Sequence, residues 1–310
     1  MIKKKIIITG PTGAIGHALI ERLLADGCEV FAICRPGSER IKGLPKHDML
    51  HVIEFDLSDL CKAITALPKD CDALYHFGWA GTFGDVRNNM PLQIKNIQYT
   101  LDAVKMAKDC GCDVFIGAGS QAEYGRVEGN LRPDTPAFPE NGYGMAKLCA
   151  GQMSRVEAKK MGIKHIWTRI LSVYGPYDGE KTMVMSTISK LLKGEKPSFT
   201  KGEQQWDYLY SKDAAGLMIA LAEKGIDGKI YCLGSGKARP LKEYIEVIRD
   251  NIDKKLPLGL GDVPYGEKQV MYLCADTTDL INDLDYKYEY TFLKGIRETI
   301  AWVKERNIVR

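Results

Sequence analysis

The sequence has no apolar run long enough to cross a membrane and no excess of charge of either sign. The apolar run near its start covers only residues 6–8, which is too short for a signal peptide or a spanning helix. Lys and Arg number 43 and Asp and Glu number 40, so the formal net charge is only +3. Nucleic-acid binders carry a larger basic excess. We therefore expect a cytoplasmic protein that binds neither membranes nor nucleic acid.

Cys-x-x-Cys pairs are also absent, although the chain has nine cysteines. The closest pair is Cys110 and Cys112, and none of the five histidines stands at metal-ligand spacing from a cysteine. The sequence thus predicts reduced, mostly packed thiols, no disulfide framework and no metal site.

What the sequence does contain is a regular alternation of short β-branched runs and amphipathic segments over its first half. This alternation predicts an α/β fold with a doubly wound parallel sheet. A chain of 310 residues also exceeds the usual size of a single core, so a smaller second lobe is expected. The expected strands cover residues 4–9, 28–34, 72–77, 113–120 and 164–171, and the expected helices cover 14–27, 91–111 and 143–162.

The alternation weakens beyond about residue 172. Residues 183–194 and 241–252 have helical patterns, and 208–225 is expected to return to the layer of the sheet. We therefore predict an interwoven organisation with no long linker. The nucleotide-binding core would cover 1–171, a segment of the substrate lobe 172–206, a return to the core 207–235 and the C-terminal lobe 236–310.

A glycine-rich turn follows the first expected strand. Gly10, Gly13 and Gly16 are spaced three apart at the start of a helix. Such a turn lets backbone amides approach a pyrophosphate, and the helix N-terminus adds partial positive charge. The turn, with its intervening residues, predicts a dinucleotide site, and a purely structural turn is the alternative. The residues of this candidate site are Gly10, Thr12, Gly13, Ala14, Ile15 and Gly16.

The tip of the second strand bears on which dinucleotide binds. An acidic side chain there would hold the adenosine ribose of NAD, whereas arginine suits the 2′-phosphate of NADP. Arg35 follows Cys34 at this tip, with no carboxylate beside it. The sequence therefore favours NADP(H), with NAD(H) as a possible alternative. Asp56, after the next strand, either bounds the adenine pocket or is a solvated strand end.

Three side chains form a candidate proton-transfer group. Tyr143 and Lys147 are four residues apart in an expected helix, so they share one face. An ammonium group beside a phenol favours the phenolate and so lowers the pKa of the tyrosine. Ser120 ends the expected fifth strand, at the edge where α/β sheets bind ligands. Its hydroxyl could hold the substrate oxygen.

With these residues in place, the chain resembles the extended short-chain dehydrogenase/reductase family of nucleotide-sugar epimerases, dehydratases and reductases. The resemblance covers nearly the whole chain and rests on the motifs "TGPTGAIG", "HFGWAG", "GSQAEYG", "YGMAK", "RILSVYGP" and "WDYLYSKDAA". It implies a Rossmann core with a small substrate lobe, a Ser120, Tyr143 and Lys147 triad, and Asn96 as a helix-bending or proton-relay residue.

The same resemblance implies further partners for these residues. Lys147 would also hold the nicotinamide ribose, and the cofactor site would include Leu57, Phe77 and Gly78. The substrate would be a nucleotide sugar. Relatives often form homodimers through helices like those expected at 91–109 and 142–161.

The sequence departs from the family pattern at the substrate site. Where 4,6-dehydratases have an Asp-Glu pair after the catalytic hydroxyl, this chain has Gln121 and Ala122, which argues against dehydration. Ser172 stands where relatives usually have asparagine, and Trp206 where they have an arginine for the substrate diphosphate. Trp206 is expected either to stack on a base or sugar or to pack at the lobe interface. Arg239 or Lys268 are candidates to replace the lost charge.

Trp79 and Thr82 are expected to line the sugar pocket with Gln121, while His76 is expected to be a core residue. The leading hypothesis is an NADPH-dependent reductase of a nucleotide-activated keto sugar, with a 4-keto-6-deoxyhexose as the expected substrate. The alternatives are an NAD-dependent 4-epimerase and a non-catalytic, cofactor-sensing protein of the same fold.

Overall fold

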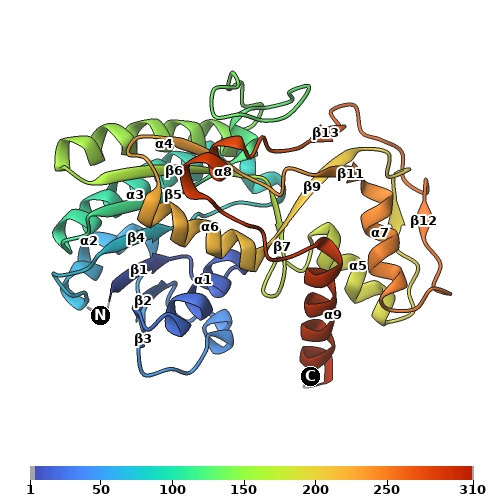
Figure 1. Cartoon of the computed structure of the whole chain (residues 1–310), viewed down its shortest axis with the longest axis horizontal. Coiled ribbons are helices and arrows are strands. Elements are labelled where there is room, and N and C mark those ends of the chain that lie inside the picture. The colour runs from blue at the N-terminus through green and yellow to red at the C-terminus, as the bar shows by residue number, and fades with distance from the viewer. Residues whose placement is uncertain (1–3, 309–310) are drawn as a thin grey trace.

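A parallel sheet of seven strands forms the centre of the computed structural model, which describes residues 4–308 (Figure 1). The strands are β1 (Lys5–Thr9), β2 (Glu29–Cys34), β3 (Leu50–Glu54), β4 (Ala73–His76), β5 (Val114–Ser120), β6 (Lys164–Ile170) and β10 (Ile230–Leu233). Their order across the sheet is β10-β6-β5-β4-β1-β2-β3, and every neighbouring pair is parallel. The expected doubly wound parallel sheet is therefore confirmed.

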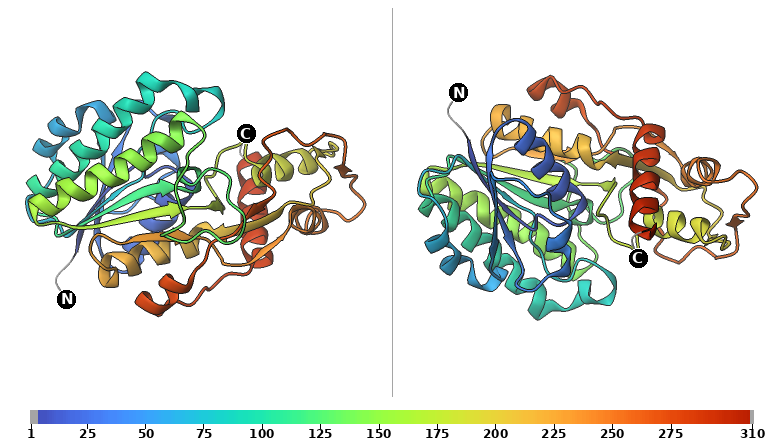
Figure 2. Two further views of the ribbon diagram at one scale, coloured as in Figure 1. Left: turned by 90° about the horizontal axis from the view of Figure 1, so that it is seen from above. Right: turned by 90° about the horizontal axis from the view of Figure 1, so that it is seen from below.

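Helices cover both faces of this sheet (Figure 2). The longer ones are α1 (Ala14–Ala25), α3 (Met90–Asp109), α4 (Gly142–Met161) and α6 (Ser211–Lys224), and the shorter ones are α2 (Leu60–Ala63) and α8 (Thr278–Leu284). Helices α3 and α4 pack together on one face, and α1 and α6 pack together on the other. The 3-10 helices between them are η1 (Glu39–Gly43), η2 (Leu57–Asp59), η3 (Ile64–Ala66), η4 (Gly84–Asn88) and η5 (Gln121–Glu123).

Because both faces are covered, the middle residues of the central strands are mostly apolar, as in β1 and β5. Ile7, Leu74 and Phe115 belong to the core under α2 and α3, while Ile8 and Ile116 belong to the core under α1 and α6. Packing in these two cores fixes the position of the sheet, and the candidate site residues lie at the carboxyl ends of its strands.

The second lobe is built from the segments after β6 and lies to the right in Figure 1. A small sheet contains β7 (Ser172–Tyr174), β9 (Gln205–Tyr210), β11 (Ala238–Pro240) and β13 (Tyr272–Leu273), and a second pair contains β8 (Ser198–Phe199) and β12 (Gly259–Leu260). The helices are α5 (Met183–Leu192), α7 (Leu241–Asp250) and α9 (Phe292–Ile308), packed around Ile188, Ile248 and Ile296.

The return of the chain to the main sheet differs in detail from the expectation. Residues 205–210 form β9 of the small sheet, and the chain rejoins the main core only with α6 and β10. The sequence could not show this because a short strand with Trp206, Leu209 and Tyr210 would fit either sheet. The domain boundaries themselves stay a prediction.

The strand order reverses between β1 and β4, since the chain runs outward through β2 and β3 and then returns to the other side of β1. Ligands of doubly wound sheets bind at the carboxyl edge near such a switch point. The turn after β1 and the end of β5 both lie on that edge.

Candidate active site

The turn between β1 and α1 is packed tightly against the loop that follows β4. Gly10 has φ +68°, and a Cβ there would lie 2.7 Å from the backbone nitrogen of Gly78. A Cβ on Gly16 would lie 2.8 Å from the carbonyl oxygen of Gly10. Both positions therefore require glycine for backbone reasons.

Gly13 has a different environment, because a Cβ there would meet nothing within 4 Å. It is the N-cap of α1, and no side chain caps that helix or places acidic charge in its first turn. The N–H groups at the start of α1 are thus not capped by a side chain, and there is room beside Gly13 for a pyrophosphate. Thr12, Ala14 and Ile15 belong to the same turn, so these residues fit a dinucleotide cofactor.

The tip of β2 carries no carboxylate. Arg35 is exposed and follows the buried Cys34. The nearest acidic side chain in the strand register is Glu54 of β3, whose Oε2 accepts the N–H of Gly37 at 2.7 Å. The acidic group is thus used to hold the turn after Arg35, which leaves the guanidinium available to a phosphate.

The remaining expected cofactor residues lie beside the glycine turn. A Cβ on Gly78 would lie 2.7 Å from Leu57, and the Gly78 N–H donates to Thr9 Oγ1 at 3.1 Å. Phe77 immediately precedes Gly78 and packs against the core under α1. Asp56 is exposed and caps η2 by accepting the N–H of Ser58, so its side chain is a solvated strand end here.

Ser120, Tyr143 and Lys147 come together at the carboxyl end of β5. Ser120 is the N-cap of η5 and its hydroxyl oxygen accepts the Ala122 N–H at 3.2 Å. Asn141 caps α4, which places Tyr143 in the first turn and Lys147 one turn later. Lys147 is 3% exposed, and its ammonium donates to the carbonyl oxygen of Ala118 on β5.

The electrostatics of this trio differ from the expectation. Burial raises the pKa of Tyr143, and a hydrogen bond with Ser120 and the charge of Arg87 partly offset that rise. Burial also lowers the pKa of Lys147 to about 7. The ammonium lies 3.7 Å from the ring centroid of Trp79 and 5.9 Å from that of Tyr143. Lys147 is therefore not the cation closest to the phenol in this structure.

Glu123 is an important site residue that the sequence reasoning missed. It is fully buried and accepts hydrogen bonds from the Ser120 N–H at 2.8 Å, Trp167 Nε1 at 3.0 Å and Arg169 Nε at 2.8 Å. The spacing Ser-x-x-Glu is that of a capping box, which could have identified it. Because both carboxylate oxygens are occupied, Glu123 supports Ser120 and is not free to act as an acid.

The loop after β4 forms one wall of the site. Trp79 Nε1 donates to Gln93 Oε1 at 2.9 Å, and the Trp79 ring meets the Tyr143 ring edge to face at 6.0 Å. The side chain of Asn96 pairs with both backbone groups of Ala80, at 2.9 and 2.8 Å. Asn96 therefore fixes the loop that carries Trp79.

Thr82 was expected to line the sugar pocket, and His76 was expected to be a core residue. Thr82 is exposed beyond Trp79. His76 is a core residue as expected: it is 2% exposed, bonds to Thr9 Oγ1 at 2.8 Å, and burial lowers its pKa to about 3.

Ser172 and Trp206, the two positions in the lobe that depart from the family pattern, contact each other. Trp206 Nε1 donates to Ser172 Oγ at 2.8 Å, and the indole packs into a cluster with Leu171, Leu273 and Cys232. The indole ring is thus packed in this structure, and whether Trp206 also stacks on a base or sugar stays a prediction. Arg239 is paired with Trp206 across β11 and β9, so its side chain projects from the same face of the small sheet.

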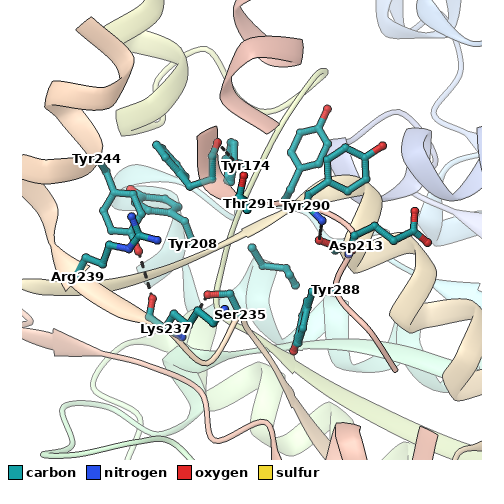
Figure 3. A pocket seen from close by; sticks show the side chains of 14 residues that line it. Tyr174, Tyr208, Asp213, Ser235, Lys237, Arg239, Tyr244, Tyr288, Tyr290 and Thr291 are labelled. Carbon is teal, nitrogen blue, oxygen red and sulfur yellow. Dashed lines mark hydrogen bonds between the residues drawn. The ribbon is translucent and has the colours of Figure 1, made fainter. Parts of the chain in front are cut away.

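Arg239 lines a pocket in the second lobe, shown in Figure 3. The cavity has a volume of about 180 Å³ and is walled by the tyrosines 174, 208, 210, 244, 288 and 290. Arg239 and Lys237 lie on one side of it, and the Arg239 guanidinium is 5.9 Å from the Tyr244 ring centroid. Both cations are exposed, and neither forms a salt bridge within residues 4–308. Lys268, the other candidate cation, is exposed in the loop before β13.

Seven of the nine cysteines are buried and all nine are free thiols. No cluster of three or more His, Cys, Asp or Glu side chains suited to an ion occurs among the described residues. No helix between residues 4 and 308 is both long enough and apolar enough to span a bilayer.

The sequence matches the model of the NAD dependent epimerase/dehydratase family over residues 6–234. It is 25% identical to an uncharacterized UDP-glucose epimerase, YtcB, of Bacillus subtilis (strain 168), over 96% of this chain and 98% of that protein. It is 23% identical to the CDP-abequose synthase of Salmonella muenchen, over 97% and 98% of the two chains.

Solved structures share the fold over essentially the full length. The UDP-N-acetylglucosamine 4-epimerase of Methanobrevibacter ruminantium M1, in complex with UDP-N-acetylmuramic acid, superposes with a TM-score of 0.88 at 24% identity, covering 99% of this chain and 100% of that one. The UDP-glucuronic acid 4-epimerase of Bacillus cereus, in complex with NAD, gives a TM-score of 0.84 at 21% identity, covering 97% and 99%.

Proposed function

The chain belongs to the NAD dependent epimerase/dehydratase family, and on that premise we propose that it is an NADPH-dependent reductase of a nucleotide-activated keto sugar. The proposed substrate class is a 4-keto-6-deoxyhexose. One observation carries the proposal: Ser120, Tyr143 and Lys147 come together, but no free acid follows Ser120. Gln121 and Ala122 cannot eliminate water, and the Glu123 carboxylate is held by Ser120, Trp167 and Arg169.

When bound at the glycine turn, a nicotinamide cofactor would provide the hydride that reduces the carbonyl carbon. Tyr143 donates its hydroxyl proton to the carbonyl oxygen, which becomes strongly basic as the hydride arrives. Ser120 donates a hydrogen bond to the same oxygen and orients it. The balance is one ketone, one NADPH and one proton giving one alcohol and one NADP⁺, with the proton of Tyr143 restored from solvent.

The choice of NADP(H) rests on the tip of β2. Arg35 is exposed there, and Glu54 is occupied by the Gly37 N–H. A guanidinium recognises a phosphate with two parallel hydrogen bonds. A reductase must also release the oxidised cofactor and bind a reduced one in each turnover. NADP(H) bound at an exposed arginine is compatible with that exchange.

Arg239 is the proposed partner of the substrate diphosphate. It projects from the face of the small sheet that carries Trp206, and its guanidinium makes no salt bridge with another described residue. Arg239→Ala should therefore raise the KM for the nucleotide sugar about 10-fold or more while leaving kcat nearly unchanged, because a charge-assisted contact contributes about 1.5–3 kcal/mol. Lys268→Ala is the matched control at the other candidate cation.

We also propose a homodimer formed through α3 and α4. Exposed apolar side chains gather on these helices, at Ile94, Met145, Met153 and Val156. Apolar surface of this kind is typical of a subunit interface.

The alternative function is a 4-epimerase. It is favoured by the name of the Bacillus subtilis relative, which aligns with 96% of this chain. An epimerase removes a hydride and returns it to the other face of the sugar, so it consumes no cofactor overall.

An assay of purified protein with NADPH and a panel of nucleotide 4-keto sugars distinguishes these functions. Loss of absorbance at 340 nm in proportion to the alcohol formed supports the reductase. Isomerised nucleotide sugar with no net loss of NADPH supports the epimerase. Cofactor binding with no turnover of either kind supports the non-catalytic sensor and contradicts both enzymes.

A further inference from the structure

Arg87 lies directly against the catalytic phenol, although nothing in its sequence position distinguishes it. It belongs to η4, in the loop between β4 and α3, and its Cζ lies 4.7 Å from the ring centroid of Tyr143. The loop is fixed on both sides. Asn88 Oδ1 accepts the N–H of Gly142 at 3.0 Å, and Gln93 Nε2 donates to the carbonyl oxygen of Val86 at 3.3 Å. The guanidinium is therefore held over the ring by the backbone around it.

The charge of Arg87 is not used elsewhere in the described part of the chain. Its Nε is buried without a hydrogen-bond partner, and its side chain forms no salt bridge with residues 4–308. By contrast, the buried Arg169 is paired with Glu123, and Arg126 is paired with Glu140. A buried donor without an acceptor is costly, so its position over a ring face indicates a role toward that ring.

The other groups that face Tyr143 are less suited to stabilise a phenolate. Lys147, from the same helix, is farther from the ring at 5.9 Å and donates to the Ala118 carbonyl. Burial holds its pKa near 7, so a fraction of it is neutral at physiological pH. Glu123, from η5, raises the pKa of Tyr143, but its charge is balanced by Arg169. Arginine keeps its charge at every pH of interest.

We propose that Arg87 is a positioning residue for Tyr143, whose guanidinium fixes the phenol ring and stabilises its phenolate form in the role that the sequence assigned to Lys147. The inference deepens the proposed function, since it concerns the group that moves the proton. The proposed effect of Arg87 on Tyr143 does not depend on the direction of the reaction or on whether the cofactor is NADP(H) or NAD(H).

The direct test is the titration of Tyr143 itself, which requires no substrate. Protein labelled with ¹³C at tyrosine Cζ would be followed by NMR against pH, and the Tyr143 signal identified by its loss in Tyr143→Phe. Arg87→Met should raise the titration midpoint of Tyr143 by about one to three pH units, the range that a close opposite charge produces. Arg87→Lys keeps a cation and should retain most of the effect. Lys147→Met should shift the midpoint by less than Arg87→Met.

Arg126→Met is the matched control, because that arginine is paired with Glu140 at the surface and lies outside the site. It should leave the Tyr143 midpoint unchanged. An unchanged midpoint in folded Arg87→Met, or a larger shift in Lys147→Met, would overturn the inference. If Arg87→Met does not fold, Arg87→Gln takes its place as the variant without charge, and an unchanged Tyr143 midpoint in folded Arg87→Gln contradicts the inference.

A kinetic test separates this inference from the proposed function. In the alcohol-oxidising direction the phenolate is the base, so its population at neutral pH falls tenfold for each unit of raised pKa. Arg87→Met should therefore lower kcat about 10- to 1000-fold near pH 7 and move the rising limb of the pH profile upward by the same one to three units. A change in KM alone, with an unmoved profile, means that Arg87 binds substrate and contradicts the inference. Absence of all turnover in wild type would reject the function while leaving the NMR titration decisive.

Discussion

At the scale of single residues, the proposed mechanism depends on the hydroxyl of Tyr143. Tyr143→Phe keeps the ring against Trp79 and Arg87 but removes the proton. General acid catalysis contributes about 10²–10⁴-fold, so kcat should fall by that factor while NADPH affinity stays nearly unchanged.

Lys147→Met should lower both turnover and cofactor affinity if that ammonium also holds the ribose. Stopped-flow turnover with cofactor titration checks both variants, and a Tyr143→Phe enzyme with more than about a tenth of the wild-type rate would show that the tyrosine is not the acid.

Arg35 carries the cofactor prediction. Arg35→Ala should weaken NADPH binding about 10- to 150-fold, equivalent to 1.5–3 kcal/mol for a charge-assisted contact, and NADH binding far less. The physical reason is that only NADPH presents a phosphate to the tip of β2. Fluorescence titration with both cofactors measures this, with Arg40→Ala as the control, since Arg40 Nη2 donates to the Tyr177 carbonyl and is already engaged. Equal losses for the two cofactors would contradict the NADP(H) assignment.

The residues that sequence reasoning could identify were those with fixed local spacing. The glycine turn and the Tyr143 and Lys147 pair follow from strand, turn and helix patterns that are local in the chain. Arg87 was missed because it lies 56 positions before Tyr143 in the chain, in a loop with no periodic pattern. The relative distances of Arg87 and Lys147 from the phenol depend on packing, which spacing does not determine.

At the scale of elements, the ladder between β5 and β6 places His165 in an apolar stack between Phe115 and Trp167, with ring centroids 5.6 and 6.2 Å away. Its Nε2 meets Ser154 Oγ at 2.9 Å, and burial lowers its pKa to about 4. The unfolded chain therefore binds a proton more strongly between about pH 6.5 and 4, and folding stability is lost as the pH falls through that window.

The expected slope from His165 is at most about 1.4 kcal/mol per pH unit, the value for one proton taken up on unfolding. Urea unfolding of wild type and His165→Gln between pH 6.5 and 4.5 should show a smaller loss of stability in the variant. His47→Gln, at an exposed side chain in the loop before β3, is the matched control. Parallel stability curves for wild type and His165→Gln would mean that this histidine is not held neutral by the sheet.

The strands of the main sheet and the long helices could be predicted from the sequence, whereas the short strands of the second lobe could not. Strands β8, β12 and β13 have only two residues each, and β13 pairs with β9 from more than 60 positions away. Strands this short are stabilised by hydrogen bonds to distant partner strands, so the local sequence does not reveal them. Helix α9 is different: Ile296, Ile300 and Val303 recur at helical spacing and are buried, a signal that was present in the sequence.

At the scale of the whole molecule, the proposed homodimer predicts where a charge should break it. Ile94 on α3 and Val156 on α4 are 65% and 50% exposed in the single chain. Ile94→Glu or Val156→Glu should convert the dimer to a monomer, because an unpaired carboxylate would be buried in the interface. Sedimentation equilibrium measures this, and Ile226→Glu, at a similarly exposed residue after α6, should leave the dimer intact. A wild-type monomer, or dimers in all three variants, would contradict the assignment of α3 and α4.

For the whole enzyme, the proposed reaction passes a hydride from NADPH to a sugar carbon, where the hydride stays. The most direct measurement is mass spectrometry of the product formed from a nucleotide 4-keto-6-deoxyhexose with NADPH deuterated at one face of nicotinamide C4. A reductase transfers one deuterium to the alcohol from one of the two labelled faces and releases one NADP⁺ for each alcohol. Nucleotide sugar isomerised without deuterium, and with no NADP⁺ released, would contradict the proposed reaction.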